Sequence, residues 1–213
     1  MERDAASGFA LLLGSLCFIV TMVFHPSSGS VERLVREAPV SVWTHSLALA
    51  SIPVTFLGLL GVHHRLKAAH MLSTAALVAY GFGSVAAMCA AVLNGLAAPA
   101  FATRFASEPA TRDMVRAILT YNSLLNTGFA KVFMVAAAAA LVLWSIAILR
   151  TRALAPWAGW VGGLVGGAGL VSVLGGFLGT SVHEFGLFIL GLSAWTVSVG
   201  VLLCQSPAQG KAA

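Results

Sequence analysis

The sequence predicts an all-α membrane protein: a single domain over residues 1–213, built as a polytopic bundle of six transmembrane helices. Two observations predict this fold class. Apolar residues make up 59% of the chain and charged residues only 9%, whereas about a quarter of the residues in soluble domains are charged. The chain also contains six separate apolar stretches, each near the roughly 20 residues that a helix needs to cross a bilayer.

The six spans follow from these stretches and from the polar or turn-forming residues between them. The first stretch lacks a small-x-small cleavage site and runs into His25-Pro26, which indicates a retained helix rather than a signal peptide. The predicted spans are residues 8–24, 42–62, 71–93, 124–149, 157–178 and 185–204.

The two long connections, residues 26–41 and 94–123, contain signs of short amphipathic helices. Ser30 precedes an apolar pattern at Val31, Leu34 and Val35, which is typical of a helix lying at the membrane interface. Pro109-Ala110-Thr111 followed by Asp113 predicts a helix start. If that helix continues to Leu149 it is roughly 58 Å long at 1.5 Å per residue, against a hydrocarbon core of ~30 Å. Its first part should therefore project beyond the membrane.

The fifth span is rich in glycine at a spacing of four residues. Gly159, Gly163 and Gly167 repeat in this way, as do Gly162 and Gly166, and the fourth span offers a smooth surface at Ala136–Ala140. Small residues at this spacing let helices approach closely. We expect tight packing within the chain. The alternative is that these faces join copies into a homo-oligomer or dock the chain on a larger membrane complex.

The basic residues predict the orientation. Arg65 and Lys67 lie in one short connection and Arg150 and Arg152 in another, without acidic neighbours. The positive-inside rule places both connections in the cytoplasm. Both termini would then be cytoplasmic in a bacterial inner membrane, with the other end of the bundle facing the periplasm. The formal charge of +5 comes without a basic run, which argues against nucleic-acid binding and leaves the lipid bilayer as the expected partner.

Polar residues gather where the predicted helices meet the periplasmic side. Polar groups inside a membrane are costly and usually face a bundle interior or a wet cavity. We therefore expect an outward-facing pocket that binds a small ligand, a lipid headgroup or a metal. The candidate ligand-binding residues are His25, His45, Asn94, Asn126, Lys131, His183 and Glu184.

Several chemistries remain open for this cluster. His25, His45 and His183 could ligate a transition metal, although no two of them share a helix at a metal-binding spacing. Haem is the less favoured alternative: His45 with His183 could ligate one haem on the outer side. The 19 residues from His45 to His64 cover about 28 Å of helix and leave both rings near water, which argues against a two-haem cytochrome. If the protein is an enzyme, His45, His183 and Lys131 are the candidate catalytic residues.

Structural roles compete with these functional ones. Ser181 and Glu184 fit the S-x-x-E capping box that opens a helix, and the Lys131 ammonium can snorkel to the membrane surface. The motifs GxSxG and HExxH are missing from the sequence. A small transporter and an accessory subunit are the alternative functions. The mostly apolar inner halves of the spans, where Tyr80 and Ser84 are the main exceptions, leave little to line a transport path.

Short motifs along most of the chain complete the sequence pattern. They are His25-Pro26, Trp43-Thr44-His45, Gly58-Leu59-Leu60-Gly61, the stretch 94–99 (NGLAAP) and the stretch 155–160 (APWAGW). In this order of features the chain resembles a loose group of bacterial six-span membrane proteins known only as domains of unknown function. The resemblance implies the six-span topology and emphasises His25 and His45. It implies no activity.

Overall fold

The computed structural model describes residues 2–26, 30–106 and 111–205, and the described chain is all-α. Within these residues, six helices are long and apolar enough to cross a membrane, which confirms the predicted polytopic bundle. The long helices are α1 (Glu2–Phe24), α3 (Ala38–Arg65), α4 (His70–Ala91), α6 (Arg112–Thr151), α7 (Pro156–Leu174) and α8 (Val182–Gln205). The short ones are α2 (Val31–Arg36), the 3₁₀ turn η1 (Lys67–Ala69), the π-helical η2 (Val92–Ala97) and α5 (Ala98–Phe105).

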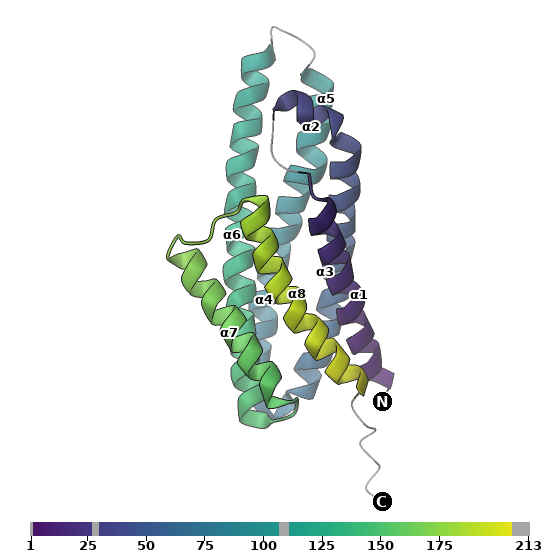
Figure 1. Cartoon of the computed structure of the whole chain (residues 1–213), viewed down its shortest axis with the longest axis vertical. Coiled ribbons are helices and arrows are strands. Elements are labelled where there is room, and N and C mark those ends of the chain that lie inside the picture. Colours follow the sequence, from purple (N-terminus) through teal and green to yellow (C-terminus); the bar gives the residue numbers. More distant parts are fainter. Residues whose placement is uncertain (1, 27–29, 107–110, 206–213) are drawn as a thin grey trace, which may run out of the picture.

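The long helices form two layers of three. In one layer α1 packs against both α3 and α8, and in the other α6 packs against both α4 and α7 (Figure 1). Buried aromatic side chains join the layers: Trp144 of α6 stacks on Trp195 of α8, and Phe133 meets Phe188 edge to face. Aromatic pairs of this kind add stability beyond the apolar area that they bury. The two layers therefore share one core.

Close approach of α7 to α6 explains the glycine spacing of the fifth span. A Cβ added to Gly166 would lie 2.7 Å from the backbone oxygen of Ala138, whereas one added to Gly167 would meet nothing within 4 Å. Ala137, Ala138 and Ala140 of α6 are buried. The expected tight packing within the chain is confirmed, and it uses one glycine face of α7. Homo-oligomer formation or docking on a larger complex through the other face stays a prediction.

The outer end of the bundle is more helical than expected. The predicted connection over residues 94–123 is wrong in its first part, because the chain continues through η2 and α5 to Phe105, whereas α6 begins at Arg112, close to the helix start that the sequence predicts. Pro99 does not end the helix: it lies in the first turn of α5, directly after the π-helical turn of η2, where the hydrogen-bond pattern already departs from that of an α-helix. The apolar-length criterion detects only helix inside lipid, so it could not find these parts.

The two expected helix starts outside the membrane are confirmed. Ser30 is the N-cap of α2, where its Oγ accepts a hydrogen bond from the backbone N–H of Arg33. Thr111 is the N-cap position of α6, and its hydroxyl donates to the carbonyl of Phe105 at the end of α5. Pro109 and Ala110, which were also part of that predicted start, lie outside the described residues.

The length of α6 has the predicted consequence. Its 40 residues correspond to about 60 Å, whereas the 19 residues of α7 correspond to about 28 Å. The first part of α6 thus projects past the α7–α8 connection and, with α5 and α2, forms the upper end of the molecule, opposite both termini (Figure 1). The fifth span ends at Leu174 rather than at residue 178, because Gly176 adopts a φ of 75°, which an L side chain rarely takes.

Candidate functional site

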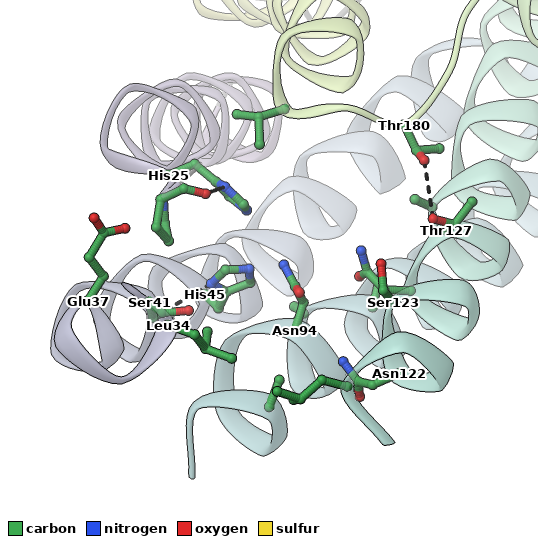
Figure 2. Close-up of a pocket in the computed structure, with 18 of the residues that line it drawn as sticks. His25, Leu34, Glu37, Ser41, His45, Asn94, Asn122, Ser123, Thr127 and Thr180 are labelled. Atoms are coloured by element: carbon green, nitrogen blue, oxygen red, sulfur yellow. Dashed lines mark hydrogen bonds between the residues drawn. The ribbon is translucent and has the colours of Figure 1, made fainter. Parts of the chain in front are cut away.

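A cavity of about 840 Å³ lies between the two layers, at the end of the bundle that carries α2 and α5. Its lining comes from both layers, from η2 and from α2 (Figure 2). Binding sites for small molecules have volumes of roughly 300–1,000 Å³. The cavity is therefore large enough for a small ligand or for part of a lipid.

The inner end of this cavity is apolar. Four of its polar lining residues have an apolar lining residue seven positions away along the chain, which in a helical segment is about two turns deeper in the bundle. This relation holds for His25 and Phe18, His45 and Ile52, Asn94 and Ala87, and Asn126 and Phe133. Ile189 of α8 completes the apolar end. A ligand that reaches this depth finds methyl groups and aromatic rings.

A ring of polar side chains, which we call the polar belt, surrounds the middle of the cavity. Thr180, from the α7–α8 connection, donates a hydrogen bond of 3.4 Å to the Thr127 hydroxyl of α6. This bond ties the connection to the belt (Figure 2). The belt comprises Thr21, His25, Ser41, His45, Asn94, Asn122, Ser123, Asn126, Thr127 and Thr180.

The outer rim of the cavity is charged. Arg33 and Glu37 form an ion pair of 2.7 Å along α2. The pKa of Glu32 lies below its ordinary value, mainly because the Ser30 hydroxyl hydrogen-bonds to it, with a smaller contribution from the charges of Arg112 and Arg116 on α6. Exposed charge pairs add little stability. They nevertheless match the acidic side of α2 to the basic start of α6 across the opening.

His25 and His45 form a pair within the belt, with ring centroids 4.7 Å apart. His45 Nδ1 lies 2.8 Å from the carbonyl oxygen of Ser41, and His25 Nδ1 lies 2.9 Å from that of Pro26. Since a carbonyl can only accept, both Nδ1 atoms carry the proton. The Nε2 atom of each neutral ring is then a hydrogen-bond acceptor. Burial lowers the pKa of His25, which favours this neutral form.

Gly95 of η2 holds the His45 ring in place. A Cβ added to Gly95 would overlap Cβ and Cγ of His45, so only a glycine fits between the two helices at this point. The wider turn of a π-helix is often found at functional sites. In η2 it accompanies the buried Gly95 and the cavity-lining Asn94. Ser41 and Gly95 thus cover two edges of the His45 ring, which is only 5% exposed.

The structure brings together four of the seven predicted ligand-binding residues. His25, His45, Asn94 and Asn126 line the cavity, whereas Lys131, His183 and Glu184 do not. Lys131 and His183 are exposed and do not contribute to the cavity lining. As candidate catalytic residues they therefore lie apart from His45.

The capping-box interpretation explains Glu184. Its carboxylate accepts hydrogen bonds from the backbone N–H of Gly179 at 3.0 Å and of Ser181 at 3.2 Å, while Ser181 Oγ accepts from the backbone N–H of Glu184. A carboxylate held in this way serves the start of α8.

The three-histidine metal site is not assembled in this structure. Within residues 2–26, 30–106 and 111–205, no group of three or more His, Cys, Asp or Glu side chains has a geometry that could hold a metal ion. His25 and His45 meet because a short connection joins their helices. His183 starts a helix of the same layer but points outward. A transition metal bound by all three residues is thus not supported by this arrangement.

Sequence reasoning did not include the rim among the candidate residues. Arg112, Arg116 and Glu32 belong to helical segments that extend beyond the membrane, where no apolar stretch marks them. The long amphipathic run that begins at Arg112 was the signal that could have identified them. The chain matches no protein-family model, no curated protein and no solved structure.

Proposed function

We propose that this chain is a protein of the bacterial inner membrane that binds one amphiphilic, lipid-like molecule in the cavity between its helix layers. The observation that carries the proposal is the graded lining, which runs from apolar side chains at the inner end through the polar belt to the charged rim. An amphiphile has the same order of tail, polar headgroup and hydrated surface.

The polar belt would supply the selectivity. Lipid tails are as apolar as leucine, so moving a tail from the bilayer into the cavity gains little free energy. Hydrogen bonds to the headgroup can distinguish ligands, because a polar group left unpaired in an apolar setting costs about 1–3 kcal/mol. His25, His45, Asn94 and Asn126 are the residues that we propose for headgroup recognition.

The proposed orientation follows from the charge of the short connections. Arg65 and Lys67, together with Arg150 and Arg152, lie at the end of the bundle opposite the cavity. The positive-inside rule favours the cytoplasm for that end and for both termini. The cavity would then open toward the periplasm.

Filling the apolar end of the cavity tests the proposal. The variant Ala130→Phe places a ring where a buried, cavity-lining methyl group lies. The matched control is Ala117→Phe, an exposed position on the same helix that does not line the cavity. The probe is 1-O-dodecylglycerol, added to protein in phosphatidylcholine nanodiscs, and the measurement is the midpoint of thermal unfolding.

We expect the probe to stabilise the wild type and the Ala117→Phe control, since a ligand at 100 times its Kd adds about 2.7 kcal/mol to the stability of the folded state. Ala130→Phe should show no such gain, although it should remain folded in the absence of the probe. Equal stabilisation of all three proteins, or of none, would contradict a ligand in this cavity.

A further inference from the structure

The bound headgroup can be specified further, on the basis of the proposed function, from the hydrogen-bonding state of the histidine pair. We infer that the ligand carries two neighbouring hydroxyl groups, a vicinal diol of the glycerol or sugar type, that donate to Nε2 of His25 and Nε2 of His45. The two rings come from different helix ends and lie within one polar belt.

The direction of these hydrogen bonds follows from the backbone. Each Nδ1–H is already used by a carbonyl, of Pro26 for His25 and of Ser41 for His45. Within the described residues, neither Nε2 atom has a hydrogen-bond partner. Both neutral rings therefore offer a lone pair. A ligand group that donates satisfies them, whereas an ether, an ester or a phosphocholine does not.

The surroundings favour neutral donors over charged ligands. Because the ring centroids are 4.7 Å apart and His45 is buried, two imidazolium charges would repel each other in a poorly solvated site. A pair of neutral rings gives an anion no donor. A ligand ammonium group would face three arginines of the rim, Arg33, Arg112 and Arg116, against only two carboxylates, Glu32 and Glu37, so the rim charge disfavours a cation on balance. Hydroxyl groups avoid both costs.

The amides of the belt complement a diol. Asn94 lies next to His45 in the cavity, with Asn122 and Ser123 across from it (Figure 2). An amide can donate to the hydroxyl oxygen while that hydroxyl donates to imidazole, because a hydroxyl is both a donor and an acceptor. Each hydroxyl of the ligand can thus form two hydrogen bonds in this belt.

A pair of probes that differ only in their donors tests the inference. The first is 1-O-dodecylglycerol, which has a vicinal diol, and the second is its 2,3-dimethyl ether, which has the same tail and no donor. Both are titrated, per mole of lipid, into wild-type protein in phosphatidylcholine nanodiscs, with the thermal midpoint as the readout. We expect the diol to bind roughly tenfold more tightly or better, because two hydrogen bonds are lost in the ether.

Variants of the pair locate the discrimination. His25→Phe and His45→Phe keep an aromatic ring and remove one of the two acceptors, and each should reduce the ratio of the two probe affinities. The control, His183→Phe, changes an exposed histidine that does not line the cavity and should retain the wild-type ratio. Unfolding in the absence of probe shows whether each variant is folded, and His25, at the end of α1, is the less buried of the two positions.

The outcomes separate this inference from the proposed function. Equal affinity for both probes in the wild type, with loss of binding in Ala130→Phe, would overturn the diol inference and leave amphiphile binding in place. A preference for the diol that is undiminished in both histidine variants would also overturn the inference. Binding of neither probe to the wild type would overturn the proposed function itself.

Discussion

Replacing Gly95 by alanine should disturb the histidine pair through a single added methyl group. That methyl would overlap Cβ and Cγ of His45. These atoms stay near the backbone in every rotamer, so the ring cannot avoid the clash by rotating. The helices α3 and η2 must separate instead, and the hydrogen bond from His45 to Ser41 is strained.

The magnitude follows from three contributions. Overpacking of this kind costs about 1–3 kcal/mol, and the weakened hydrogen bond costs about 1 kcal/mol. Alanine regains about 1 kcal/mol of helix propensity relative to glycine. We therefore expect Gly95→Ala to lower the stability by about 1–3 kcal/mol and to weaken the binding of dodecylglycerol.

The control is Gly128→Ala on α6, where an added Cβ meets nothing within 4 Å. It should gain up to about 1 kcal/mol from helix propensity alone. Both variants are compared by thermal unfolding and by probe titration in nanodiscs. If Gly95→Ala proves as stable as Gly128→Ala and binds the probe equally well, the proposed fixation of His45 by Gly95 is wrong.

Three further predictions concern other parts of the chain. Lowering the pH below about 6.5 should destabilise the protein, because burial lowers the pKa of His25 from that ordinary value. As the pH falls, His25 of the unfolded chain therefore takes up a proton before His25 of the folded chain does. The contribution of the neutral His25 to stability is complete above this pH and declines below it. The His25→Gln variant should show a shallower decline in thermal midpoint, and an unchanged slope would refute this assignment. Gly166→Ala should lower the stability of the folded protein by about 1–3 kcal/mol, because the added methyl group would press on the Ala138 carbonyl oxygen. The control Gly167→Ala should be neutral or stabilising, since its methyl group meets nothing within 4 Å. Equal melting temperatures of the two variants would show that α7 does not pack as described. Glu184→Ala should lower the thermal midpoint by removing the capping-box partner of Ser181 without changing probe affinity, and a loss of affinity in the folded variant would show that Glu184 contributes to the site.

The transmembrane part of the fold could be predicted because the bilayer constrains it. A helix that crosses lipid must be apolar over a defined length, and this requirement identified all six spans. Outside the membrane the constraint ends. Phe105 and Arg112 thus bound helices that no apolar stretch revealed, and the 94–123 connection was predicted to be longer than it is.

The candidate site could be predicted in depth but not in direction. Counting residues along a span predicts the height of a side chain, and His25, His45, Asn94 and Asn126 do line one cavity. Lys131 and His183 were expected in the same cluster, yet they are exposed and do not line the cavity. The direction of a side chain depends on which face of its helix meets a neighbour. Helix packing therefore decided which polar residues meet.

The short length of α7 sets the height of the cavity relative to the lipid headgroups. A helix of about 28 Å nearly equals the thickness of the hydrocarbon core, so we expect the α7–α8 connection to lie at the membrane surface, where Leu174 and Phe177 are 71% and 80% exposed on the surface of the chain. Thr180 in that connection is bonded to the polar belt through Thr127. We therefore expect the belt to be level with the headgroups of the surrounding leaflet. A lipid could move sideways into the cavity without changing its depth, and its local concentration would be that of the leaflet rather than that of the surrounding water.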